Sequence, residues 1–147
     1  MIVRCDLAPL DGITKSVFRR VWGRCFGGAD RYFIPFFSPT PQHILTPRDR
    51  RELETLSGLH QVPQVMTCRA EDFLWAAETV KDLGYDEVNL NLGCPSGTVT
   101  AKGKGAGFLA KPEELDRFFD TVFTRSPLPV SVKTRLGIQS PEEFGRL

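Results

Sequence analysis

The sequence predicts an α/β fold, specifically a partial TIM (β/α)8 barrel comprising about the first five strands and four helices. Short apolar segments alternate with amphipathic segments of helical period along the 147 residues, which is typical of a parallel sheet with crossover helices. Polar side chains lie in or after four of the five expected strands: Asp11, Gln64, Cys68, Asn89, Asn91, Lys133 and Arg135. This distribution favours a barrel over an open doubly wound sheet, which gathers its site at one crevice.

The first part of the chain is expected to contain two strands and two helices. A strand over Ile2–Leu10 ends in the turn signal Ala-Pro-Leu-Asp-Gly. A helix over Lys15–Phe26 ends at a Gly-Gly pair, and an aromatic strand follows over Arg31–Phe37. A proline-rich loop then leads to a short charged helix over Pro47–Leu59. The first helix is expected to place five residues on one apolar face: Val17, Phe18, Val21, Trp22 and Cys25.

The second part of the chain continues the alternation. We expect strands over Pro63–Cys68, Glu87–Leu92 and Pro129–Leu136, and helices over Glu71–Leu83 and Pro112–Phe123. A capping box, Ser140-Pro141-Glu142-Glu143, then predicts the start of one more helix, but only four residues follow it. The chain is therefore expected to end inside an element, with five strands where a closed barrel has eight.

The composition is that of a soluble globular domain. Hydrophobic residues make up 41% and charged residues 25%, which excludes disordered, collagen-like and coiled-coil chains. The net charge of +1 gives no electrostatic indication of a nucleic-acid partner, without excluding one. No apolar stretch could span a membrane, and no metal site is expected. The four cysteines have wide, irregular spacings that favour free thiols in a reducing cytoplasm: Cys5, Cys25, Cys68 and Cys94.

Cys94 follows an expected strand directly and opens a glycine-rich segment, Gly93–Lys111. A thiol at a strand end would lie at the mouth of a barrel, where reactive groups sit, although a lone cysteine is more commonly structural. The segment has no acidic residue and three lysines, Lys102, Lys104 and Lys111. It is expected to form a mobile cationic lid suited to phosphates or an RNA backbone, with a solvated flexible loop as the alternative.

Three further residues, on two of the expected strands, are candidates for ligand contact. Lys133 and Arg135 share one face of the last strand, where two cations facing the interior would be costly without an anion. An edge strand with a solvated face is the alternative. Gln64 lies in an apolar strand, and a buried amide needs partners, so it either braces the backbone or binds a ligand.

These segments together resemble the tRNA-dihydrouridine synthases. The matching motifs are Ala8-Pro9-Leu10-Asp11-Gly12-Ile13-Thr14, Pro63-Gln64, Asn89-Leu90-Asn91-Leu92-Gly93-Cys94-Pro95 and Val132-Lys133-Thr134-Arg135-Leu136-Gly137. They occur in the family's order and cover nearly the whole chain. Two departures are visible: Leu10 stands where the family usually has Met, and Lys15 where it commonly has Asp.

The resemblance implies an FMN-dependent oxidoreductase, with NADPH as reductant, that reduces the C5=C6 bond of uridine in tRNA. Flavin N5 would deliver hydride to C6 and Cys94 would protonate C5. Asn91 and Arg135 would contact the flavin or the uracil. The cofactor-binding residues implied by position are Pro9, Leu10, Asp11, Gln64 and Lys133.

The resemblance also implies that residues 1–147 are the N-terminal portion of the catalytic barrel. The family's last barrel strands, which hold the FMN phosphate, and its helical tRNA-binding domain have no counterpart in the sequence. Two alternatives stay open. One is an FMN barrel dehydrogenase that acts on a free pyrimidine. The other is an inactive half-barrel that self-associates through its open edges.

Overall fold

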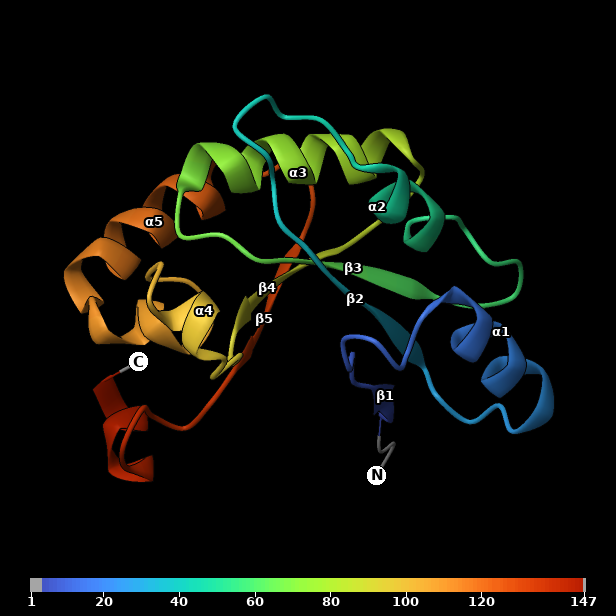
Figure 1. The fold of residues 1–147 in the computed structure, drawn as a ribbon, viewed down its shortest axis with the longest axis horizontal. Coiled ribbons are helices and arrows are strands. Elements are labelled where there is room, and N and C mark those ends of the chain that lie inside the picture. Colours follow the sequence, from blue (N-terminus) through green and yellow to red (C-terminus); the bar gives the residue numbers. More distant parts are fainter. Residues whose placement is uncertain (1–3, 147) are drawn as a thin grey trace.

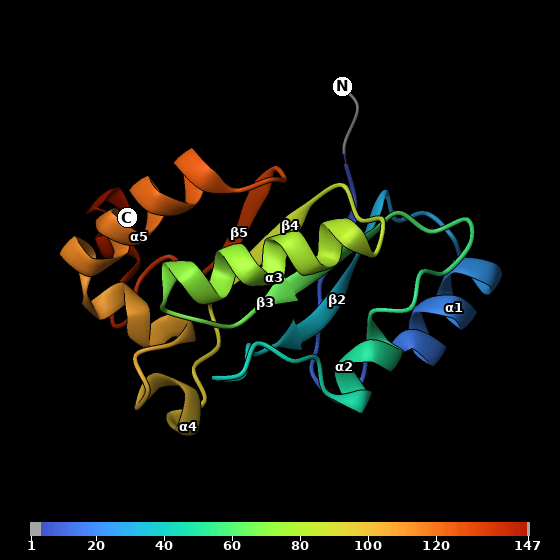
Figure 2. The same ribbon diagram turned by 90° about the horizontal axis from the view of Figure 1, so that it is seen from above.

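The computed structural model of the protein describes residues 4–146 and contains one parallel sheet with the strand order β1-β2-β3-β4-β5. Each strand lies beside the one that precedes it, so the sheet curls into a half-barrel with the helices outside (Figures 1 and 2). This confirms the predicted α/β partial TIM barrel. The strands are β1 (Asp6–Leu7), β2 (Arg31–Phe37), β3 (Gln61–Val65), β4 (Val88–Leu92) and β5 (Val130–Thr134).

Apart from the end of α2, the helices α1, α2, α3 and α5 begin and end close to the predicted positions. Helix α2 starts with a capping box, because Thr46 Oγ1 accepts the N–H of Asp49 and the Asp49 carboxylate accepts the N–H of Thr46, both at 3.2 Å. The helices are α1 (Ser16–Cys25), α2 (Pro47–Glu52), α3 (Ala70–Asp82), the short α4 (Gly97–Thr100) and α5 (Pro112–Arg125). Two 3-10 helices complete the fold, η1 (Gly105–Ala110) and η2 (Pro141–Arg146).

The main core lies between the outer face of the sheet and helices α3 and α5. Phe118 is its aromatic centre, with the rings of Phe73 and Phe108 edge-on to it at 5.8 and 5.4 Å. Tyr85 belongs to this core and donates its hydroxyl to the carbonyl of Leu53 at 2.9 Å. Burial raises the pKa of Tyr85 to about 12. The sheet contributes Ile34, Val65, Val88, Leu90 and Leu92 to the core.

Helix α1 does not bury the predicted apolar face. Val17 is 71% and Val21 52% exposed, and Cys25 is also exposed, whereas Arg19 is completely buried. The prediction is wrong because the layer beneath α1 is polar: the Arg19 guanidinium reaches Glu52 and Gln61 there. The aromatic side chains of α1 instead stack along the helix, Phe18 on Trp22 and Trp22 on Phe26.

Several element bounds differ from the prediction. Strand β1 has two residues within the described part of the chain, and part of the predicted strand, residues 2 and 3, lies outside it. Helix α2 ends at Glu52, with Leu53 as its C-cap, and the chain then turns at Leu56–Leu59, where Gly58 has φ +79°. The capping box at Ser140 is followed by a 3-10 helix, η2. Among the described residues, no helix is long and apolar enough to cross a membrane.

Candidate functional site

Three amide side chains form a hydrogen-bonded chain across β3 and β4. Gln64 Nε2 donates to Asn89 Oδ1 at 2.7 Å, and Asn91 Nδ2 donates to Gln64 Oε1 at 2.8 Å. Asn89 Nδ2 donates in turn to Ser131 Oγ on β5 at 2.9 Å. Gln64 is only 1% exposed, so these partners replace the water that its amide loses on folding. Gln64 therefore braces the asparagines of the neighbouring strand.

This row of hydrogen-bonded side chains continues, through charged groups, to the amino ends of the strands. Ser131 Oγ donates to Glu87 at 2.5 Å, and Glu87 pairs with Arg31 Nη1 at 2.5 Å. Arg31 also donates to the Asp6 carboxylate, at 2.7 Å, and this hydrogen bond holds the pKa of Asp6 below its usual range. Five strands are thereby joined by one polar network. Arg31 and Glu87 could not be found from the sequence, because they are 56 residues apart and no local pattern links them.

The backbone of Cys94 is held from both sides. Asn91 Oδ1 accepts the N–H groups of Gly93 at 3.1 Å and Cys94 at 3.0 Å. On the other side, the N–H of Ala106 donates to the carbonyl of Cys94 at 3.0 Å. Since Asn91 is itself held by Gln64, the position of the cysteine is coupled to the amide chain of the sheet.

The glycine-rich segment that follows Cys94 is folded over most of its length, whereas its composition predicts a mobile cationic lid or a solvated flexible loop. It forms α4 and η1, and Phe108 is buried in the core. Its glycines permit close contacts: a Cβ at Gly105, where φ is +55°, would lie 2.8 Å from the carbonyl oxygen of Cys94. A Cβ at Gly107 would lie 2.6 Å from the carbonyl oxygen of Thr100. These glycines therefore fix the segment against Cys94, although their number had suggested flexibility.

A cavity of about 230 Å³ lies at the inner face of the sheet. Lys133 reaches it from β5, and Pro9 reaches it from the loop that follows β1. Lys133 is the register partner of Asn91, so the two residues lie side by side on neighbouring strands. Arg135 is close as well, since its Cγ lies 3.6 Å from the place a Cβ at Gly93 would take. The cavity is lined by Asp6, Ala8, Pro9, Arg31, Phe33, Asn89, Ser131, Val132 and Lys133.

The other two predicted residues of the first loop do not line this cavity. The Asp11 carboxylate accepts a hydrogen bond from Arg48 of α2 at 2.7 Å, away from the amide chain. Leu10 is exposed, and its backbone N–H and carbonyl are both bonded to Thr14 Oγ1. The structure thus joins Pro9, but neither Leu10 nor Asp11, to the cavity with Lys133.

The site contains one thiol and cationic groups. All four cysteines are free. Over residues 4–146, no three His, Cys, Asp or Glu side chains are grouped as metal ligands. The side chains of Lys133 and Arg135 form no ion pair with any described residue, so both charges are available to an anion. A thiol whose backbone is held by Asn91 at a strand end can serve proton transfer to a ligand bound nearby.

Known proteins are similar to this chain over most of its length. The family model of dihydrouridine synthases matches residues 6–145. A probable tRNA-dihydrouridine synthase of Staphylococcus epidermidis is 33% identical over 94% of this chain and 43% of its own length. A probable tRNA-dihydrouridine synthase 1 of Synechocystis sp. is 32% identical over 88% of this chain and 36% of its own length. The chain thus spans about two fifths of the length of these curated relatives.

Proposed function

Because the chain belongs to the dihydrouridine synthase family, we propose that it is the part of a tRNA-dihydrouridine synthase that presents the catalytic cysteine. The observation that carries this proposal is the position of Cys94. It lies just beyond the carboxyl end of β4, where its N–H donates to Asn91 Oδ1 and its carbonyl accepts the N–H of Ala106. Barrel enzymes place their reactive groups at these strand ends.

We propose FMN as the cofactor, reduced by NADPH, and the residues of the inner cavity fit this group. Pro9 and Phe33 supply apolar surface, and the Lys133 ammonium, free of any described carboxylate, supplies a positive charge. When bound, FMN supplies the hydride that reduces C6 of the uracil. The charge of Lys133 would stabilise the negative charge that a flavin carries in its reduced form.

The amide chain has hydrogen-bonding capacity left for a ligand. Gln64 uses one N–H and one lone pair on the two asparagines, which leaves one of each. Because Gln64 is so deeply buried, we propose that it acts mainly by orienting Asn91. Asn91 keeps one N–H of its own, which can reach the flavin or the uracil, and Arg135 can contact the same ligands.

The role proposed for Cys94 is proton donation to C5 of the uracil. A thiol carries a proton that it can donate, so it can act as a general acid. A cation bonded to the sulfur would oppose this role, because it would stabilise the thiolate. Within residues 4–146, neither Lys102 nor Lys104 forms a hydrogen bond with the Cys94 sulfur.

Discrimination between tRNA and a free pyrimidine tests the substrate of this site. We expect that the chain, supplied with FMN and NADPH, forms dihydrouridine in an unmodified tRNA transcript and leaves free uridine unchanged. The physical reason is that a base in tRNA is presented with its phosphate backbone, whose binding energy helps to hold the base against the flavin. The measurement is dihydrouridine content by mass spectrometry. Equal reduction of free uridine and tRNA would favour a dehydrogenase of free pyrimidines instead.

We also propose that the half-barrel self-associates. Within the described part of the chain, β1 pairs only with β2 and β5 pairs only with β4, so both sheet edges carry unpaired backbone groups. Val132 and Leu136 are exposed at the β5 edge, and Leu10 and Ile13 are exposed after β1. At micromolar concentration, light scattering should give at least twice the chain mass of 16.5 kDa. Val132→Lys should lower that mass, whereas a wild-type monomer would contradict the proposal.

A further inference from the structure

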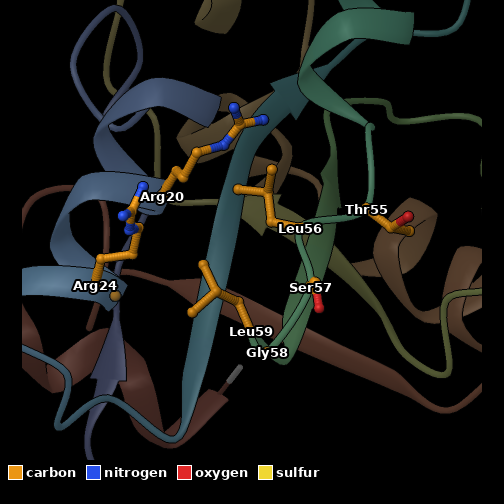
Figure 3. A pocket seen from close by; sticks show the side chains of 8 residues that line it. Arg20, Arg24, Thr55, Leu56, Ser57, Gly58 and Leu59 are labelled. Carbon is orange, nitrogen blue, oxygen red and sulfur yellow. The ribbon is translucent and has the colours of Figure 1, made fainter.

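A pocket of about 490 Å³ lies on the outer surface, away from Cys94. It is formed between α1 and the connection from α2 to β3, and Figure 3 shows its lining side chains. None of these residues belongs to the amide chain or to the inner cavity. The lining consists of Arg20, Gly23, Arg24, Thr55, Leu56, Ser57, Gly58 and Leu59.

The shape of the pocket is fixed by two glycines. Leu59 packs against α1 at Gly23, where a Cβ would overlap its methyl group. The connection turns tightly here, because the N–H of Leu59 donates to the carbonyl of Leu56 at 3.2 Å while Gly58 has φ +79°. The helix and the turn therefore pack against each other, and this packing fixes the shape of the pocket between them.

The pocket has hydrogen-bond donors and no acidic residue. Arg20 and Arg24 are one helical turn apart on α1. Neither forms an ion pair or a side-chain hydrogen bond with a described residue. Arg19 of the same helix, in contrast, pairs with Glu52. The hydroxyls of Thr55 and Ser57 also donate to no described residue. In Figure 3 the arginines lie on one side, Leu56 and Leu59 in the middle, and Thr55 and Ser57 opposite.

We propose that this pocket binds the phosphate backbone of an RNA strand. Guanidinium groups bind phosphate oxygens in a bidentate manner, and the neighbouring leucines lower the local dielectric, which strengthens that attraction. Donors on both sides of an apolar centre match a strand in which charged phosphates alternate with ribose. The net charge of the chain is only +1, so the attraction for phosphates would come from these two neighbouring arginines and not from the overall charge. The choice of RNA rests on the proposed tRNA substrate, but the pocket is separate from the Cys94 site.

Charge-matched variants test the proposal. The double variant Arg20→Gln/Arg24→Gln removes the two cations of the pocket, and Lys81→Gln/Arg117→Gln removes two cations from the exposed surfaces of α3 and α5. Anisotropy of a short fluorescent single-stranded RNA measures binding to the full chain. We expect the pocket variant to bind at least tenfold more weakly (on the order of 1.4 kcal/mol) and the control to stay within about twofold. The slope of the logarithm of the binding constant against the logarithm of salt concentration should be smaller in magnitude by about 1.4 in the pocket variant, because each lost phosphate contact of a single strand removes about 0.7.

Other outcomes would overturn the proposal. These are absence of RNA binding by the wild-type chain, an equal loss in both double variants, and equally tight binding of a polyglutamate peptide to the same arginines. Circular dichroism checks that each variant folds. The proposed function is tested separately, because Cys94→Ala should bind RNA like the wild type and Arg20→Gln/Arg24→Gln should bind FMN like the wild type.

Discussion

Replacing Cys94 with alanine is expected to lower the rate of uridine reduction by at least about 100-fold and to leave FMN binding unchanged. A positioned general acid accelerates a reaction roughly 10²- to 10⁴-fold, and the alanine side chain has no acidic proton to donate. Flavin binding should survive because Asn91 and Ala106 hold residue 94 through its backbone, which alanine retains. The measurement is dihydrouridine formed in unmodified tRNA, beside the visible absorption of the bound flavin.

Two matched variants sharpen this test. Cys68→Ala removes the other partly buried cysteine, whose sulfur contacts the carbonyl of Lys102, and should leave turnover within about twofold. Gly105→Ala keeps the thiol but pushes against the carbonyl of Cys94, so it should slow reduction without removing the acid. Turnover by Cys94→Ala at the wild-type rate would show that another group protonates C5.

Arg19→Ala is expected to destabilise the fold by about 3 to 5 kcal/mol, the range found when one partner of a buried ion pair is removed. Arg19 is fully buried and donates to the carbonyls of Thr14 at 2.7 Å and Glu52 at 2.8 Å, and to Gln61 Oε1 at 3.1 Å. Burial lowers the pKa of Arg19, and the Glu52 carboxylate at 3.3 Å opposes this shift. Alanine would remove the guanidinium from these acceptors, and among the described residues the Glu52 carboxylate would keep only the N–H of Ser16.

Urea unfolding followed by circular dichroism measures this effect. The control is Arg20→Ala on the next residue, which is exposed and forms no ion pair with a described residue, and should change stability by no more than about 0.5 kcal/mol. Similar unfolding midpoints for the two variants would contradict the structural role given to Arg19.

The fold was predictable from the sequence because its signals are local. The apolar strand Arg31–Phe37 has the predicted bounds, and α3 and α5 follow their helical periods to within two residues. Helix α1 was misjudged because periodicity assigns arginine to the solvent. Besides the nearby Thr14 carbonyl, the residues that accept hydrogen bonds from Arg19 are 33 and 42 positions away. A single sequence cannot show such partners.

The candidate site also has contacts that local sequence predicts and contacts that it does not. Asn91 and Cys94 are three residues apart, so their contact follows from local spacing, and the parallel sheet brings Lys133 beside Asn91. The network from Asp6 to Ser131 joins four separate segments and gave no local signal. Gly105 and Gly107 were misjudged for another reason: composition records the number of glycines, but not the backbone atoms that approach them.

The most direct test of the central proposal, a flavin site beside Cys94, is a titration of FMN followed by its visible absorption. We expect one FMN bound per chain. Lys133→Ala should weaken binding about tenfold or more, because a hydrogen bond to a charged group contributes roughly 1.5 to 3 kcal/mol. Lys81→Gln, on the outer surface, should bind FMN like the wild type. Absence of a bound-flavin spectrum, or equal affinity in Lys133→Ala and the wild type, would contradict this site.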